Sequence, residues 1–152
     1  MRQAMKRTGE AAVQGITFTV LGTPKPQGSM RAITGRNGKA FLKSDNEAMR
    51  PWRQEVGWTA LRARSEAGYN DVFAGRHVPV RVRYVFTFRP PGTMPKGRVL
   101  PAVKPDMDKL CRAIGDALKG VLYEDDGQIV ESSERKVYGP VAMAEITVEI
   151  LA

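Results

Sequence analysis

The sequence has little of the residues that form disulfides and soft-metal sites. Its 152 residues include one cysteine, Cys111, and one histidine, His77. A single cysteine excludes an internal disulfide and a zinc site built from cysteines, and it favours a reducing compartment. Because His77 has no second histidine near it, we assign it no ligand role. Any metal ion bound by this chain would therefore depend on carboxylates.

Long hydrophobic runs are also absent. No stretch approaches the roughly 20 apolar residues that a membrane-spanning helix needs. The first fifteen residues, MRQAMKRTGEAAVQG, contain basic residues but lack the apolar run of a secretory signal. We therefore expect a cytoplasmic protein without a membrane partner.

Positive charge is concentrated near the N-terminus of a chain whose net charge is +8. Residues 1–43 contain eight Lys or Arg residues and one acidic residue, Glu10, whereas basic and acidic residues almost balance in the remainder. Such a basic segment suits the phosphate backbone of nucleic acid, because Lys and Arg displace its condensed counterions. A solubility tail and a patch for an acidic protein partner are the alternatives.

Hydrophobic alternation predicts four strands of one sheet, at residues 16–22, 78–88, 127–139 and 141–152. The Asn-Gly pair of RNGK, at 36–39, predicts a hairpin between two short apolar runs. Interspersed strands and helices of this kind indicate an α+β fold, with a mixed or antiparallel sheet packed against two main helices.

The chain organisation follows from the same pattern. We expect a flexible N-terminal segment over residues 1–15 and a single domain over residues 16–152. Residues 89–105 contain five prolines and no periodicity, which predicts a long loop. A loop of that length inside a small domain is usually functional.

Two helices are predicted. Ser44 and Glu47 fit a capping box for a first helix that ends near Ala67, with Pro51 either kinking it or starting its main body. The second helix spans residues 106–121, with Asp106 as the N-cap. Its apolar residues share one face: Leu110, Ala113, Ile114, Ala117, Leu118 and Val121.

Six of the sixteen acidic residues lie between residues 104 and 126. Asp106 and Asp108 stand at the start of the second predicted helix, and Glu124, Asp125 and Asp126 follow its end. Because an N-cap residue is not helical, Asp106 can turn toward Asp108. Acids at a helix start stabilise it, and Asp-Asp-Gly is a common turn sequence. The pattern therefore fits solvated helix ends and a metal site about equally well.

A carboxylate site without Cys or His suits Mg²⁺, or Mn²⁺ in its place. In a basic protein it suggests phosphodiester hydrolysis, because bound Mg²⁺ reverses the repulsion between carboxylates and phosphate and generates hydroxide. Lys109 and Arg112 follow Asp108 on the same helix. Both are placed to stabilise the charge that develops in the transition state.

The stretch PDMDKLCRAIGDALKGVLYEDDGQIVESSERKVYG resembles the signature region of the RusA family of Holliday-junction resolvases. That signature runs Asp-x-Asp-Asn, then Lys, then Asp-Ala-Leu, then Asp-Asp. The likeness extends over roughly residues 16 to 151 and includes the N-terminal strand, the basic hairpin and the first helix. Members are homodimeric α/β proteins, many of them encoded by phages or prophages, which cut four-way DNA junctions symmetrically with Mg²⁺.

The resemblance implies that Asp106, Asp108 and Asp126 are catalytic carboxylates that bind the metal, with Asp125 as a supporting acid. It implies no small organic cofactor. Lys109 stands where the family usually has Asn, and Arg112 stands where it has a functional Lys. Arg keeps the positive charge but does not release its proton, so Arg112 can stabilise a phosphate but cannot shuttle a proton.

The leading hypothesis is a Mg²⁺-dependent endodeoxyribonuclease that resolves Holliday junctions by paired symmetric cuts. A DNA-binding protein with weak or no catalysis is the second hypothesis, motivated by Lys109 and Arg112, and a metal-dependent enzyme acting on nucleotides or small phosphates is the third. The expected partners are branched DNA and a second copy of the chain. The predicted DNA contacts are Arg31, Arg36, Lys39, Lys43, Lys96, Arg98, Lys104 and Lys136.

Overall fold

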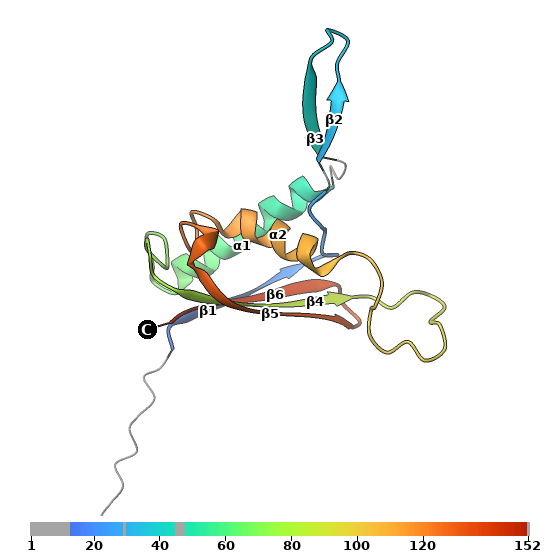
Figure 1. Cartoon of the computed structure of the whole chain (residues 1–152). Helices are drawn as coiled ribbons and strands as arrows, with labels where there is room; N and C mark the ends of the chain where they lie inside the picture. Colours follow the sequence, from blue (N-terminus) through green and yellow to red (C-terminus); the bar gives the residue numbers. More distant parts are fainter. Residues whose placement is uncertain (1–12, 29, 45–47, 152) are drawn as a thin grey trace, which may run out of the picture.

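The computed structural model describes residues 13–28, 30–44 and 48–151, and it is built on a four-stranded sheet (Figure 1). The strands are β1 (Gly15–Leu21), β4 (Val80–Phe88), β5 (Ile129–Tyr138) and β6 (Met143–Ile150). Their order across the sheet is β1-β6-β4-β5, with β4 and β5 parallel and the other two pairs antiparallel. The sheet is therefore mixed.

Two helices, α1 (Met49–Glu66) and α2 (Met107–Leu118), cover one face of this sheet (Figure 1). The predicted α+β class, with one mixed sheet and two main helices, is confirmed. Among the described residues, no helix is long and apolar enough to cross a bilayer. The segment predicted to be flexible, residues 1–15, lies mostly outside the described residues, and β1 begins at Gly15.

The core lies between the sheet and the helices. Alternate side chains of each central strand are buried, as a period of two requires when one face is covered. The buried side chains of β4 are Val80, Val82, Tyr84 and Phe86, and those of α2 are Leu110, Ala113, Ile114 and Leu118. The opposite face of the sheet is polar. There Arg81 of β4 forms ion pairs with Glu131 of β5 and Glu149 of β6.

The first helix starts later than its predicted capping box. Ser44 ends β3 (Ala40–Ser44), Glu47 lies outside the described residues, and the N-cap of α1 is Ala48. Pro51 is thus the third residue of the helix. A proline is tolerated in the first turn because the backbone N–H groups there have no partner within the helix. Pro51 therefore fits within α1 without the kink, or the helix start at Pro51, that the sequence suggested.

The second helix starts as predicted and ends three residues early. Asp106 is its N-cap, with φ −69° and ψ 139°, so its backbone is extended. The helix ends at Leu118, and Gly120 follows with φ 80°, a conformation that favours glycine. Residues 121–123 continue as a tight turn in which the Gly120 N–H donates to the Tyr123 carbonyl. That turn directs the acidic residues after it back along the helix.

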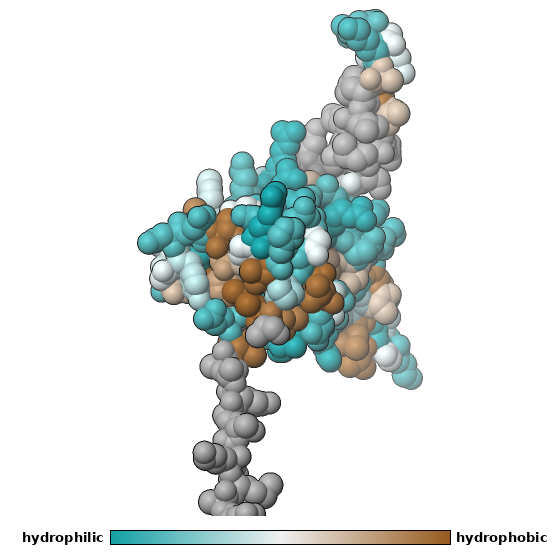
Figure 2. Space-filling view, turned by 60° about the vertical axis from the view of Figure 1, so that its left-hand side comes forward, coloured by the Kyte–Doolittle hydropathy of each residue, from teal (hydrophilic) through white to brown (hydrophobic). Residues whose placement is uncertain are grey.

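The predicted hairpin is present as β2 (Met30–Thr34) and β3, a separate antiparallel pair that projects from the body (Figure 1). Its turn is closed by a hydrogen bond from the Gly35 N–H to the Lys39 carbonyl. The Asn37 side chain accepts a second one from the Lys39 N–H. Figure 2 shows that the described tip is hydrophilic. Residues 89–105 form the expected long loop between β4 and α2.

Candidate active site

Two of the predicted catalytic carboxylates, Asp108 and Asp126, lie along one side of α2, and the third, Asp106, is its N-cap. Asp108 is in its first turn, and Arg112 and Gly115 follow at i+4 and i+7, on the same face of the helix. The turn after α2 brings Asp126 back to Gly115. A Cβ atom placed on Gly115 would lie 3.8 Å from Oδ1 of Asp126 and 3.6 Å from the Tyr123 hydroxyl oxygen. Along the axis of α2, Arg112 therefore lies between Asp108 and Asp126.

This arrangement spreads the carboxylates apart. Gly115 is seven positions after Asp108 in the helix, which is about 10 Å along the helix axis. Within residues 13–28, 30–44 and 48–151, no three or more His, Cys, Asp or Glu side chains gather closely enough to hold a metal ion. Binding one ion with Asp106, Asp108 and Asp126 together requires these exposed side chains to turn toward each other.

Each of the three carboxylates has a basic neighbour. Nζ of Lys104 is 3.9 Å from Oδ2 of Asp106, and a guanidinium nitrogen of Arg112 is 3.9 Å from Oδ2 of Asp108. Nζ of Lys119 is 3.5 Å from Oδ2 of Asp126. Exposed pairs of this kind contribute only about 0–1 kcal/mol. They reduce the repulsion among the carboxylates and are weak enough to open for a divalent cation.

The donor chemistry fits a hard divalent cation. Asp106, Asp108 and Asp126 are all exposed and offer carboxylate oxygens, the ligands that Mg²⁺ and Mn²⁺ prefer. Although Asp106 is the N-cap residue of α2, its side chain makes no capping hydrogen bond. Its carboxylate is therefore not needed to satisfy the helix end.

The negative charges of acids in this region contribute to the raised pKa values of two nearby side chains, Cys111 and Tyr84. Burial, then the charges of Glu134 and Asp108, raise the pKa of the Cys111 thiol to about 12. Burial also raises the pKa of Tyr84, with smaller contributions from Cys111, Glu134 and Asp126. Cys111 thus stays a neutral thiol near pH 7 and is not a nucleophile. Glu134, on β5, adds a carboxylate to this region that the sequence analysis did not single out.

Asp125 has a structural role in the acidic turn. It is the N-cap of a short 3₁₀ helix, η1 (Asp126–Gln128), and its Oδ1 accepts a hydrogen bond of 2.9 Å from the Gly127 N–H. The Gln128 side chain completes a capping box by accepting from the Asp125 N–H. One oxygen of Asp125 is thus engaged locally, which fits a supporting acid better than a primary ligand.

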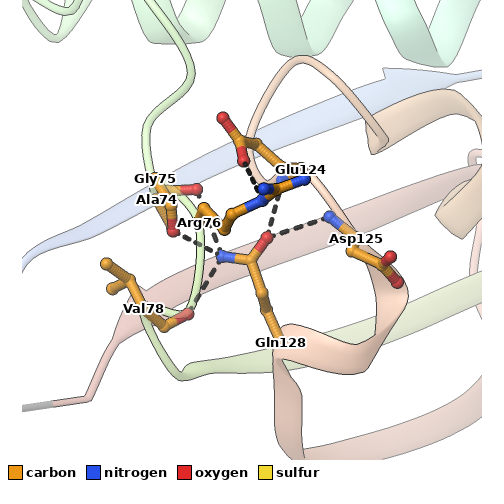
Figure 3. Close-up of polar contacts among 7 residues, drawn as sticks. All are labelled: Ala74, Gly75, Arg76, Val78, Glu124, Asp125 and Gln128. Carbon is orange, nitrogen blue, oxygen red and sulfur yellow. Dashed lines mark hydrogen bonds and ion pairs between the residues drawn. The ribbon is translucent and has the colours of Figure 1, made fainter.

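The sequence analysis missed Gln128, which is central to this turn (Figure 3). It is the one polar side chain that is buried in the described part of the chain. The available signal was a polar residue placed directly before the apolar pair Ile129–Val130 at a strand start. Periodicity alone does not show that such a residue is turned inward.

The predicted DNA contacts fall on three elements. Arg36 and Lys39 are exposed in the hairpin turn, and Arg31 and Lys43 are cross-strand partners in the hairpin register. Lys96 and Lys104 are exposed and Arg98 is half-buried in the 89–105 loop. The base of the hairpin is tied to the site, because the Gln27 N–H donates to the carbonyl of Lys109 in α2.

Lys136, the remaining predicted contact, is on β5 and reaches the segment that leads into the N-terminus of α2. Its ammonium group donates to the carbonyls of Val103, at 2.6 Å, and Pro105, at 2.9 Å. These carbonyls lie directly before Asp106. Lys136 thus fixes the end of the long loop from which Asp106 enters α2.

Comparison with known proteins shows the family to which the chain belongs. The family model described as endodeoxyribonuclease RusA matches residues 23–150. The chain therefore belongs to the RusA family, whose members are endodeoxyribonucleases that resolve Holliday junctions. It is also 30% identical over 138 residues to the uncharacterized protein YqaN of Bacillus subtilis (strain 168), a match that covers 88% of this chain and 94% of that relative. The predicted family is confirmed.

The Lys136 geometry gives a testable prediction. Replacing Lys136 with Met keeps the aliphatic stem but removes the donors to Val103 and Pro105. We expect junction cleavage at saturating DNA to fall about 10–100-fold, the usual range for a residue that orients a metal ligand. We expect the salt dependence of DNA binding to stay unchanged.

Lys96→Met is the matched control, because Lys96 is an exposed lysine of the loop whose end Lys136 holds. It should lower the slope of log K against log salt by about 0.9 and leave the saturated rate near wild type. If Lys136→Met instead behaves like this control, Lys136 is a phosphate contact and not an anchor of the loop.

Proposed function

We propose that this chain is a Mg²⁺-dependent endonuclease that cuts four-way DNA junctions by paired symmetric cleavage. The observation that carries the proposal is the placement of Asp108 and Asp126 along one side of α2, with Asp106 at its N-cap, in a chain of the RusA family. Lys104 of the 89–105 loop pairs with Asp106, and the segment that leads into the basic hairpin is tied to α2 by the hydrogen bond from the Gln27 N–H to the Lys109 carbonyl.

The three carboxylates would hold Mg²⁺, with Asp125 supporting them. When bound, this ion would supply Lewis-acid polarisation of the phosphate and a water of lowered pKa. Before substrate binds, Lys104, Arg112 and Lys119 neutralise part of the carboxylate charge. Because its pair with Asp108 is exposed and long, Arg112 would be free to face the scissile phosphate when Asp108 serves as a ligand.

Arg112 then acts as a fixed positive charge toward the phosphate oxygens. An exposed guanidinium between Asp108 and Asp126 can donate to two of those oxygens at once. It stabilises the charge that grows in the transition state but provides no proton for the leaving oxygen. Lys109, half-buried one residue after Asp108, is the candidate for a second positive charge.

A second function, DNA binding without cleavage, is supported by the same ion pairs. Each predicted metal ligand already has a cation within 4 Å, which competes with a divalent ion. Labelled four-way junctions incubated with Mg²⁺ distinguish the two proposals. Binding without symmetric nicks would favour the second.

Neutralising the carboxylates tests the site. We expect Asp106→Asn, Asp108→Asn and Asp126→Asn each to reduce junction cleavage on the order of 10³-fold or more, because each removes a charged ligand from the reacting centre. DNA binding should stay intact or tighten, since a negative charge that repels DNA is lost. Cleavage and gel-shift assays measure both effects.

Asp116→Asn is the matched control for these variants. Asp116 is an acid of the same helix, but it pairs with Arg53 of α1 at 3.8 Å and should be dispensable for cleavage. The assignment of the site is wrong if the three site variants cut at the wild-type rate.

Salt dependence tests the basic surface. Arg36 and Lys39 sit in the exposed turn of the hairpin, so the double change Arg36→Ala and Lys39→Ala should lower the slope of log K against log salt by about 1.8. Arg83→Ala is the control, because Arg83 pairs with Glu149 on the sheet face opposite the helices. An affinity that does not change with salt would remove this surface from the proposal.

We further propose that the active form is a two-fold symmetric dimer. One chain supplies one set of Asp106, Asp108 and Asp126, whereas a junction needs two cuts at symmetry-related phosphates. Both tryptophans of the chain are on α1, where Trp52 is buried in the core and Trp58 is 63% exposed. Trp58 lies next to the exposed Leu61 on α1, which makes this part of α1 the candidate contact.

Sedimentation at micromolar concentration should give about twice the chain mass of 16.8 kDa. Trp58→Lys should shift the protein toward monomer, because it places a charge in an apolar contact. A wild-type monomer that still resolves junctions symmetrically would contradict the dimer.

A further inference from the structure

The amide of Gln128 joins two segments that are distant in the sequence (Figure 3). Its Oε1 accepts hydrogen bonds from the backbone N–H groups of Glu124, at 2.8 Å, and Asp125, at 2.9 Å. Its Nε2 donates to the carbonyls of Ala74, at 3.2 Å, Gly75, at 2.8 Å, and Val78, at 3.0 Å. The side chain is only 7% exposed.

An amide is the side chain that this position requires. One end must accept from two N–H groups, and the other end must donate toward three carbonyls. Only Asn and Gln combine an acceptor oxygen and a two-donor nitrogen on one neutral group. Replacing the amide with an apolar group would leave buried backbone groups without partners, which is costly.

These hydrogen bonds fix the backbone from which the acids project. Glu124 and Asp125 receive both bonds to Oε1, and Asp126 is the next residue. In Figure 3 the carboxylate of Asp125 points away from Gln128. The amide therefore holds the backbone of the acidic turn from the inside and leaves the carboxylates outside.

The Nε2 group of the amide is bonded to a second segment, which makes further contacts with the acidic turn. The carbonyls of Ala74, Gly75 and Val78 belong to the segment that enters β4, and Ala74 is fully buried. The same segment meets the turn a second time through the Ala74 N–H, which donates to the Leu122 carbonyl. A third contact is the ion pair between Arg76 and Glu124, at 3.9 Å.

We propose that Gln128 is a positioning residue for metal binding: by fixing the backbone of Glu124 and Asp125, it sets where Asp126 meets the side of α2 that carries Asp108. This inference rests on the proposed function, because it concerns the same carboxylates. It extends that function by assigning part of the metal affinity to a side chain that touches neither metal nor DNA.

The test compares Gln128→Met with Val148→Ala, measured on the metal-free and DNA-free full chain. Met preserves the length of the side chain but removes its polar atoms. Val148 is a fully buried residue of β6 that faces the core, so its truncation lowers stability without touching the acidic turn. Calorimetry gives the Kd for Mn²⁺, and amide hydrogen exchange reports the N–H groups of Glu124 and Asp125.

For Gln128→Met we expect the Kd for Mn²⁺ to rise about 10–100-fold, as for other residues that orient metal ligands. The Glu124 and Asp125 amides should exchange at least about tenfold faster, because their acceptor is lost. Val148→Ala should lower the melting temperature yet keep the Kd within about twofold. Where Gln128→Met does not fold, Gln128→Asn replaces it, because it keeps the amide but is too short to serve both sides.

A Gln128 variant that folds and binds Mn²⁺ with wild-type affinity would overturn the inference while leaving the proposed function intact. A wild type that binds Mn²⁺ but does not cut junctions would overturn the proposed function, and a raised Kd in the Gln128 variant would still support the inference. A wild type that binds no Mn²⁺ would overturn both.

Discussion

Both ends of the acidic side of α2 are held by hydrogen bonds from the β5 region, and the rest of the site depends on them. Gln128, directly before β5, holds the turn that carries Asp125 and Asp126. Lys136, within β5, holds the carbonyls that precede Asp106. Because β5 pairs in parallel with β4 from Ile129 to Tyr138, with one register shift after Ile129, Gln128 directly precedes the paired strand that contains Lys136. Their separation fixes the separation of the carboxylate-bearing segments.

Basic neighbours reduce the electrostatic repulsion among the acids of this cluster. Carboxylates placed along one helix face repel each other, and each has one basic neighbour, from three different positions in the chain. Because all these pairs are exposed and 3.5–3.9 Å apart, they lower the repulsion without locking the acids. The rigid part of the site is its backbone, and the adaptable part is its charged side chains.

Local patterns in the sequence predicted the parts of the structure that are locally determined. The alternation in β4, the Asn-Gly hairpin and the N-cap at Asp106 depend on neighbours within a few residues, and each is present. The end of α2 was placed too late, because Val121 continues the apolar stripe although Gly120 has already left the helix. The start of α1 was placed too early for a related reason, since Ser44 belongs to the hairpin.

The anchors could not be predicted from such patterns. The bonds from Gln128 to Ala74, Gly75 and Val78 span 50 to 54 residues, and those from Lys136 to Val103 and Pro105 span 33 and 31. Neither periodicity nor spacing reports a contact over that distance. The sequence predicts Lys136 as a DNA contact and places Gln128 at the start of a strand, and neither prediction contains these long-range hydrogen bonds.

Under the proposed function, the basic residues and the acidic cluster of the chain have complementary roles. The predicted DNA-binding cations lie mainly on the hairpin and on the long loop, whereas the predicted catalytic carboxylates lie at the N-cap of α2, in its first turn and in the turn after it. Empty carboxylates repel a phosphate backbone, so under the proposed function a divalent ion would reverse the local field. The basic elements would hold the duplex arms without that ion. Binding and cleavage would then depend on different elements, and only cleavage would depend on the backbone positions that Gln128 and Lys136 hold.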